Sequence, residues 1–161
     1  SREDVVPLDA ELEALRLYIE LESMRFQDSF EWKIIINEDV RTLDIMVPPL
    51  LLQPFVENAI WHGLMQAPAL MVKKLNVNIY KKADDIKIEI VDNGIGREKA
   101  TFLKSKSGDK HKSHGIALTE ERLKLTQKLH GIISSITIED LYDAQSNSCG
   151  TKVMIILNHK K

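Results

Sequence analysis

Three polar residues near the middle of the chain carry side chains that could perform chemistry together. Glu57, Asn58 and His62 supply a carboxylate, an amide and an imidazole within about one helical turn, in a run that is otherwise mostly apolar. A carboxylate beside an amide oxygen suits a divalent cation that also contacts phosphate oxygens, and an imidazole adds a group for acid or base catalysis. The alternative is a polar helix edge that faces solvent.

A second group of candidate residues follows an apolar strand. Asp92 is followed by Asn93, Gly94, Ile95 and Gly96. A carboxylate at the end of a buried strand can accept a hydrogen bond from an amino group of a ligand, and the two glycines allow the backbone to approach closely. The alternative is an ordinary turn, because Asn-Gly is a common turn dipeptide.

The third candidate is the segment 113–118, in which Gly115 forms a small-residue turn that opens a helix. The free N–H groups and the positive dipole end of a helix bind anions, although every helix has such an end. The preceding run 104–114 is rich in Lys, Ser and His and has no apolar periodicity. This pattern predicts a mobile loop.

Other motifs for nucleotides, metals and nucleophiles are excluded. The chain has no P-loop, and Lys99 stands where a dinucleotide-binding fingerprint needs its third glycine. His111 and His114 have no further ligands spaced to complete a zinc site. The one cysteine, Cys149, excludes an intrachain disulfide.

Length and composition indicate one globular domain. The chain has 161 residues, of which 43% are hydrophobic and 29% are charged, and its net charge is −2. This charge argues against a nucleic-acid partner, because it supplies no long-range positive field. No apolar stretch approaches the roughly 20 residues that span a bilayer. We expect a soluble, cytoplasmic piece of a longer protein, since no Met precedes the first helical pattern.

The elements that must position these residues follow from periodicity. Hairpins in place of strand–helix–strand units favour a mixed, mainly antiparallel sheet with helices on one face, a two-layer α/β sandwich. Asp9 is the expected N-cap of the first helix, and Pro54 lies in the first turn of the second. The expected helices span 9–26, 50–64 and 115–130, and the expected strands span 30–36, 75–80, 86–91, 132–139 and 150–157.

The first helix carries two apolar stripes where a lone domain needs one. The second stripe predicts packing against an upstream helix or a second subunit, and the alternative is a helix buried within this domain. One stripe contains Leu8, Leu12, Leu15, Ile19 and Phe26, and the other contains Ala10, Ala14, Leu17, Leu21 and Met24.

The three candidate segments, in this order, resemble the N, G1 and G2 boxes of the GHKL ATPases, which have the Bergerat fold. Gly150-Thr151 resembles the closing box, and the run 51–63 looks specifically like sensor histidine kinases of the LytS/YehU type. The resemblance extends from about residue 6 to 157. It implies a linker helix over 1–28, from a missing phosphoacceptor region, and an ATP-binding catalytic domain over 29–161.

The resemblance implies a role for each matched residue. Asn58 would coordinate the Mg²⁺ that bridges the ATP phosphates, Glu57 would orient or deprotonate the accepting histidine, and His62 would lie near the ribose or phosphates. Asp92 would bind the adenine amino group. Gly94 and Gly96 would shape the adenine pocket, and Thr151 would support it through water.

The run from Arg97 to His114 would be a lid over the ATP. The resemblance implies that four lid side chains approach the phosphates and that the turn of the G2 box lies beneath them. The lid residues are Lys110, His111, Lys112 and His114, and the residues of the turn are Gly115, Ala117 and Leu118.

Three departures from the family pattern matter. Trp61 stands where many N boxes have Lys or Arg, Ala117 replaces the second glycine of the G2 box, and no Asn-Pro-His acceptor motif occurs. We therefore expect a chain that binds Mg-ATP and transfers the γ-phosphoryl group to a histidine elsewhere, without autophosphorylation of its own.

The implied partners are the phosphoacceptor region, a response regulator and a second copy in a full-length homodimer of the bacterial inner membrane. The alternatives are a degenerate nucleotide-binding or dimerisation module, and another GHKL ATPase or serine kinase of the anti-sigma type.

Overall fold

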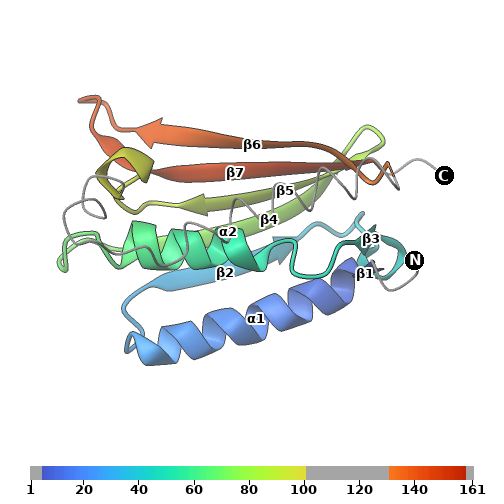
Figure 1. The fold of residues 1–161 in the computed structure, drawn as a ribbon, viewed down its shortest axis with the longest axis horizontal. Helices are drawn as coiled ribbons and strands as arrows, with labels where there is room; N and C mark the ends of the chain where they lie inside the picture. The colour runs from blue at the N-terminus through green and yellow to red at the C-terminus, as the bar shows by residue number, and fades with distance from the viewer. Residues whose placement is uncertain (1–4, 101–130, 159–161) are drawn as a thin grey trace.

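The computed structural model describes residues 5–100 and 131–158 (Figure 1). Its main sheet has five strands in the order β2-β4-β5-β7-β6. The pairing of β2 with β4 is parallel, and the other three pairings are antiparallel. The strands are β2 Glu31–Ile36, β4 Lys74–Lys82, β5 Asp85–Asp92, β6 Ile133–Tyr142 and β7 Ser148–Asn158.

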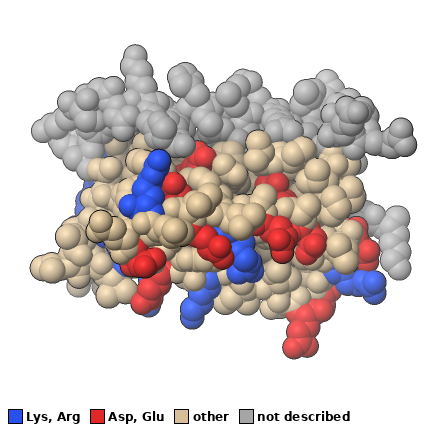
Figure 2. All heavy atoms as spheres, turned by 90° about the horizontal axis from the view of Figure 1, so that it is seen from below, with Lys and Arg blue, Asp and Glu red and all other residues tan. Residues whose placement is uncertain are grey.

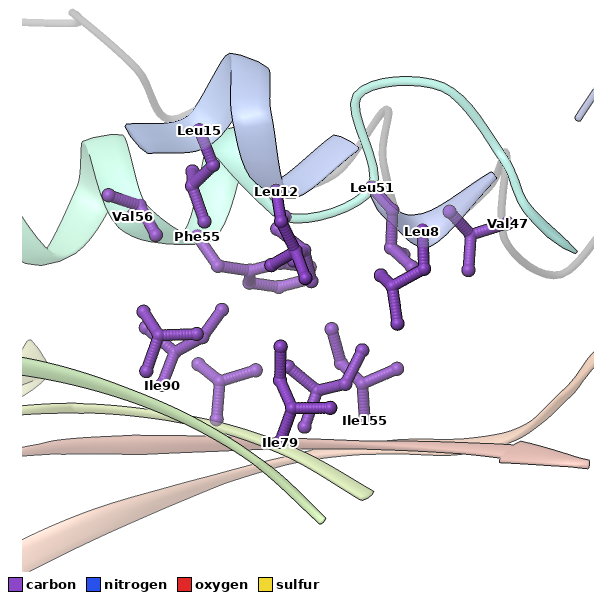
Figure 3. Close-up of a cluster of buried hydrophobic side chains, with 14 of the residues drawn as sticks. Leu8, Leu12, Leu15, Val47, Leu51, Phe55, Val56, Ile79, Ile90 and Ile155 are labelled. Carbon is purple, nitrogen blue, oxygen red and sulfur yellow. The ribbon is translucent and has the colours of Figure 1, made fainter. Parts of the chain in front are cut away.

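The helices form a second layer on one face of this sheet (Figures 1 and 3). They are α1 Leu8–Arg25, α2 Gln53–Asn58 and the π-helix η3 Ala59–Leu64, which continues α2 directly. A two-stranded sheet of β1 Val6–Pro7 and β3 Met46–Val47 and a 3-10 turn, η2 Thr42–Asp44, complete the described elements. The two-layer sandwich with a mixed, mainly antiparallel sheet is confirmed.

Alternating apolar residues place one face of the sheet in the core, as the period of two predicts. Figure 3 shows Leu8, Leu12 and Leu15 of α1 facing the sheet above Ile79 and Ile155. All five side chains are at most 4% exposed. Burial of each such side chain stabilises the fold by roughly 1.5–3 kcal/mol, and α1 therefore belongs to the same core as the sheet.

The first helix begins one residue before its predicted N-cap. Pro7 is the N-cap residue, and Asp9 lies in the first turn, where its Oδ1 accepts a hydrogen bond from Thr42 Oγ1 at 3.4 Å. Proline is well suited to this place because its missing N–H has no partner to lose at a helix start. The expectation that Asp9 caps the helix is wrong.

The second helix begins at Gln53 and not at residue 50. The buried carboxylate of Glu11 on α1 accepts hydrogen bonds from the Leu50 and Leu52 N–H groups, both at 3.0 Å. These bonds hold the preceding loop out of helical geometry, with Leu50 at a φ of 59°. Pro54 lies in the first turn, as predicted.

The end of this helix also differs from the prediction of a regular helix to residue 64. From Ala59 to Leu64 the backbone is π-helical, and the Met65 N–H donates to the Ile60 carbonyl at 2.9 Å. π-Turns are rare and often occur at functional sites. Apolar periodicity cannot distinguish this wider turn from an α-turn.

The two stripes of α1 differ in burial. Leu12, Leu15 and Ile19 are at most 4% exposed, whereas Leu17 and Leu21 of the second stripe are 59% and 65% exposed. The alternative in which the helix is buried on both sides within this domain is therefore wrong. Figure 2 views the molecule from the side of α1 and shows acidic and basic side chains interspersed with uncharged surface.

The predicted helix 115–130 and the predicted lid from residue 101 onward lie outside the described residues. Within the described ranges, no helix is both long enough and apolar enough to cross a membrane.

Candidate functional site

A pocket lies between the α2–η3 segment and the strands β5, β6 and β7. Its apolar walls come from both layers, and polar side chains of η3, β5 and β7 open onto it. The apolar lining includes Phe55, Ala59, Ile90, Ile138 and Val153. The polar lining includes Asn58, His62, Asp92, Arg97 and Thr151. An apolar pocket with a few convergent polar groups is the usual form of a small-molecule site.

Asp92 is the acidic group of this pocket, at the end of β5. Its side chain is buried, and burial raises the pKa of Asp92 to about 7 because the charged form loses its hydration. The Gly94 N–H donates to its Oδ1 at 2.9 Å and lowers the pKa, but this effect is smaller. Thr151 of β7 lies directly opposite Asp92 in the antiparallel ladder. The structure thus brings two predicted residues side by side.

Glycines around Asp92 permit a close approach of the two layers. A Cβ on Gly94 would overlap the backbone of Gly63, and a Cβ on Gly63 would lie 2.7 Å from Asp92 Oδ1. The Ile95 N–H donates to the Gly63 carbonyl at 3.2 Å, which ties η3 to the loop after β5. Gly96 has a φ of 84°, where a side chain is strained. Sequence analysis assigned no role to Gly63, although its place near the end of the expected helix was visible.

The structure divides the predicted trio of α2 and η3 between two sides of the helix. Asn58 and His62, four residues apart, line the pocket. Glu57 is not among the lining residues found in the described part of the chain, and its Oε1 accepts a hydrogen bond from Gln53 Nε2 at 3.3 Å. Trp61, four residues after Glu57, contacts α1. The trio is therefore brought only partly together.

Arg97 joins the pocket to β6 at the start of the predicted lid. Its Nε and Nη2 atoms bind the two carboxylate oxygens of Asp140 at 2.7 and 2.9 Å. The hydrogen bond from Arg97 holds the pKa of Asp140 below its usual value. Sequence analysis missed this pair, because 43 residues separate its members.

Seven predicted ligand residues of the lid and the G2 box lie outside the described residues: Lys110, His111, Lys112, His114, Gly115, Ala117 and Leu118. Over the ranges 5–100 and 131–158, no group of three or more His, Cys, Asp or Glu side chains could hold a metal ion. Asn58 remains the predicted metal ligand.

Comparison with the sequences of known proteins finds LytS sensor proteins as relatives. No family model matches the chain. A sensor protein LytS of Oceanobacillus iheyensis is 33% identical over 99% of this chain, and the sensor histidine kinase/phosphatase LytS of Staphylococcus aureus is 30% identical over all of it. These matches cover 26% of each relative, so the chain spans about a quarter of their length.

Solved structures of the same fold are catalytic domains or larger parts of histidine kinases. The catalytic domain of the histidine kinase ThkA matches with a TM-score of 0.58 at 15% identity, over 96% of this chain and 94% of its own. The histidine kinase AdeS of Acinetobacter baumannii matches with a TM-score of 0.62 at 12% identity, over 98% of this chain and 67% of its own. At this identity the likeness shows the fold.

Proposed function

We propose that this chain, which is homologous along its whole length to part of the LytS sensor histidine kinases, is their ATP-binding catalytic domain. It would bind Mg-ATP and pass the γ-phosphoryl group to a histidine outside residues 1–161. The observation that carries this proposal is a buried carboxylate, Asp92, at the base of an apolar pocket.

The pocket suits an adenine ring. The apolar side chains of both layers can pack on the faces of a purine, and Asp92 can accept a hydrogen bond from its amino group. The absence of a Cβ at Gly63 leaves room beside the carboxylate. Thr151, which is opposite Asp92 in the ladder, would support the same edge through water.

Asn58 and His62 line the same pocket one helical turn apart, which suits contact with phosphates and ribose. The Asn58 amide oxygen would hold Mg²⁺, a cation that prefers oxygen ligands. When bound, Mg-ATP supplies the transferable phosphoryl group and metal charge. Catalysis of this transfer depends mainly on positioning and charge stabilisation, so the chain would act by orienting the phosphates. Glu57 would orient or deprotonate the accepting histidine. For the lid residues and the G2 box, the family resemblance alone supports contact with the phosphates.

We assign residues 1–28 to a linker helix that packs on the core of the catalytic domain, and residues 29–161 to the catalytic domain itself. The proposed partners are a phosphoacceptor region, a response regulator and a second copy of the full-length protein in the bacterial inner membrane. The exposed second stripe of α1 supports the second copy, because Leu17, Leu21 and Met24 are more than half exposed.

Calorimetry with Mg-ATP tests the proposal. We expect binding by the parent chain and loss of at least tenfold in affinity for Asp92→Asn, which loses the acceptor for the adenine amino group, and for Asn58→Ala, which loses the oxygen ligand of Mg²⁺. Asp84→Asn, in the exposed turn between β4 and β5, is the matched control and should bind normally. If both site variants bind Mg-ATP as tightly as the parent chain, Asp92 and Asn58 do not form the nucleotide site.

A degenerate nucleotide-binding or dimerisation module is the second candidate. Trp61 favours it, because a tryptophan that contacts α1 cannot replace a cation at the phosphates. Phosphorylation of a histidine-containing fragment added in trans would exclude this candidate. Phosphoamino-acid analysis of the product separates the histidine kinase from a serine kinase of the same superfamily.

A further inference from the structure

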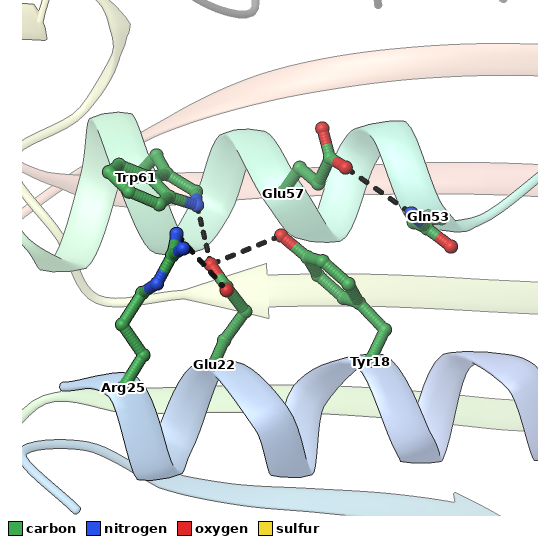
Figure 4. A network of polar contacts seen from close by, with 6 residues as sticks. All are labelled: Tyr18, Glu22, Arg25, Gln53, Glu57 and Trp61. Carbon is green, nitrogen blue, oxygen red and sulfur yellow. Dashed lines mark hydrogen bonds and ion pairs between the residues drawn. The ribbon is translucent and has the colours of Figure 1, made fainter. Parts of the chain in front are cut away.

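Trp61 contacts α1 instead of the pocket. Its Nε1–H donates to Glu22 Oε2 at 2.6 Å (Figure 4). The Phe26 ring packs edge-on against the indole, with 5.1 Å between the centroids and an interplanar angle of 76°. The Arg25 guanidinium lies 5.5 Å from the ring centroid on the same side of α1. The indole is therefore held by two residues of α1, Glu22 and Arg25, and by its C-cap residue, Phe26.

Glu22 is the centre of this contact and is only 7% exposed. Besides the indole, Tyr18 donates its hydroxyl to Glu22 Oε2 at 3.4 Å, and Arg25 lies 3.7 Å from Oε1. A buried carboxylate needs such donors, and removal of one leaves an uncompensated charge. The Trp61–Glu22 hydrogen bond, at 2.6 Å, is shorter than a usual N–H···O bond.

The same network reaches Glu57, the proposed partner of the accepting histidine. Burial raises the pKa of Tyr18 above its usual value, and the charges of Glu57 and Glu22 raise it further. Gln53 Nε2 donates a hydrogen bond to Glu57 Oε1 at 3.3 Å (Figure 4). Glu57 is therefore hydrogen-bonded to a residue of its own helix, and its charge acts on Tyr18 of α1.

Neighbours of Glu57 and Trp61 in the sequence line the pocket. Asn58 follows Glu57, and His62 follows Trp61 within the π-helix η3. Because neighbouring side chains on one helix turn together, the rotation that sets Trp61 against Glu22 also sets His62 and Asn58 toward the pocket.

We propose that Glu22 and Trp61 are positioning residues of the nucleotide site, and that their hydrogen bond makes the site's affinity depend on the position of α1. This inference rests on the proposed function. Linkage is reciprocal, so a nucleotide in the pocket must in turn change the environment of the Trp61–Glu22 pair.

The test is a double-mutant cycle on the affinity for Mg-ATP, measured by calorimetry on the whole chain. Trp61→Phe keeps an aromatic ring and removes the N–H donor, and Glu22→Ala removes the acceptor. Each should weaken binding by about fivefold or more, the lower end of typical couplings between sites. The double variant should be no weaker than either single variant, because both remove the same bond. Glu22→Gln keeps an acceptor oxygen and should retain most of the affinity.

Two controls separate positioning from stability. Glu20→Ala changes an exposed carboxylate of the same helix, and Leu8→Val truncates a buried residue at its opposite end. Leu8→Val should lower the melting temperature without changing the affinity. A second readout is the fluorescence emission of Trp61, measured in chains that carry Trp32→Phe so that Trp61 is the only tryptophan. Saturation with Mg-ATP should shift this emission when Glu22 is present and should not shift it when Glu22 is replaced by Ala.

The outcomes distinguish the two claims. If the parent chain does not bind Mg-ATP, the proposed function fails and this inference fails with it. If the parent binds and the network variants bind equally well, or if their effects multiply in the double variant, Glu22 and Trp61 do not position the site. A Trp61 emission that does not change when nucleotide binds would also show that Glu22 and Trp61 do not position the site. In both cases the proposed function is unaffected.

Discussion

The substitution Asp92→Asn should change stability and ligand binding in opposite directions. The carboxylate is 4% exposed, and within the described residues no ion pair involves it. The amide is close in shape and keeps an oxygen that can accept the Gly94 N–H. The substitution therefore removes the buried charge and leaves the local hydrogen bond.

The magnitude follows from the shift in pKa. Burial raises the pKa of Asp92 to about 7 from an ordinary value of 3.8. Between these values the folded chain binds more protons than the unfolded chain, so stability falls as pH rises through this window. Each pKa unit is worth about 1.4 kcal/mol, and the cost above pH 7 is therefore up to about 4 kcal/mol. Below about pH 4 the carboxyl is neutral in both states and the cost disappears.

Denaturant unfolding of both chains at pH 4 and pH 8, without nucleotide, measures this effect. We expect Asp92→Asn to be more stable by about 2–4 kcal/mol at pH 8 and nearly equal to the parent at pH 4. In calorimetry the same variant should lose Mg-ATP binding, because its NH₂ group would face the adenine amino group donor to donor. A variant that is less stable than the parent at pH 8 would refute the reasoning. The charged form of Asp92 would then stabilise the folded chain instead of destabilising it.

Three further substitutions test other contacts. Gly94→Ala should destabilise the domain by about 1–3 kcal/mol and abolish nucleotide binding, because its Cβ overlaps Gly63; equal melting temperatures would contradict this close approach. Glu11→Ala leaves the Leu50 and Leu52 N–H groups without their acceptor and should cost about 1–3 kcal/mol in denaturant unfolding, against little change for the exposed Glu13→Ala. Leu17→Glu should leave the melting temperature unchanged but weaken self-association of the full-length protein in sedimentation, and unchanged sedimentation would count against a dimer through this stripe.

Local patterns in the sequence predicted the strands of the sheet and singled out Asn58, His62 and Asp92 of the pocket, whereas Thr151 was implied only by the family resemblance. Strict alternation in β4 and β5 identifies two central strands, and Asp92 stands out because a charge ends an apolar run. Asn58 and His62 lie on one helix face at a spacing that the sequence displays directly.

Contacts between distant segments could not be read in the same way. Glu11 and Glu22 look like ordinary charges of an amphipathic helix, yet one holds the loop before α2 and the other binds Trp61, 39 residues away. Within the wider π-turn of η3, Gly63 accepts a hydrogen bond from Ile95 of the loop after β5, a contact between segments more than 30 residues apart. The departure at Trp61 was visible in the sequence, but its cause lies on another helix.

Transfer of phosphate from ATP labelled at its γ-phosphate to a fragment that contains the proposed phosphoacceptor histidine tests the central claim most directly. With this chain present, we predict a label on the fragment that is lost in acid and retained in base, as for phosphohistidine, and that is absent with Asn58→Ala. An unlabelled fragment, or an acid-stable label on serine, would contradict the assignment of this chain as the catalytic domain of a histidine kinase.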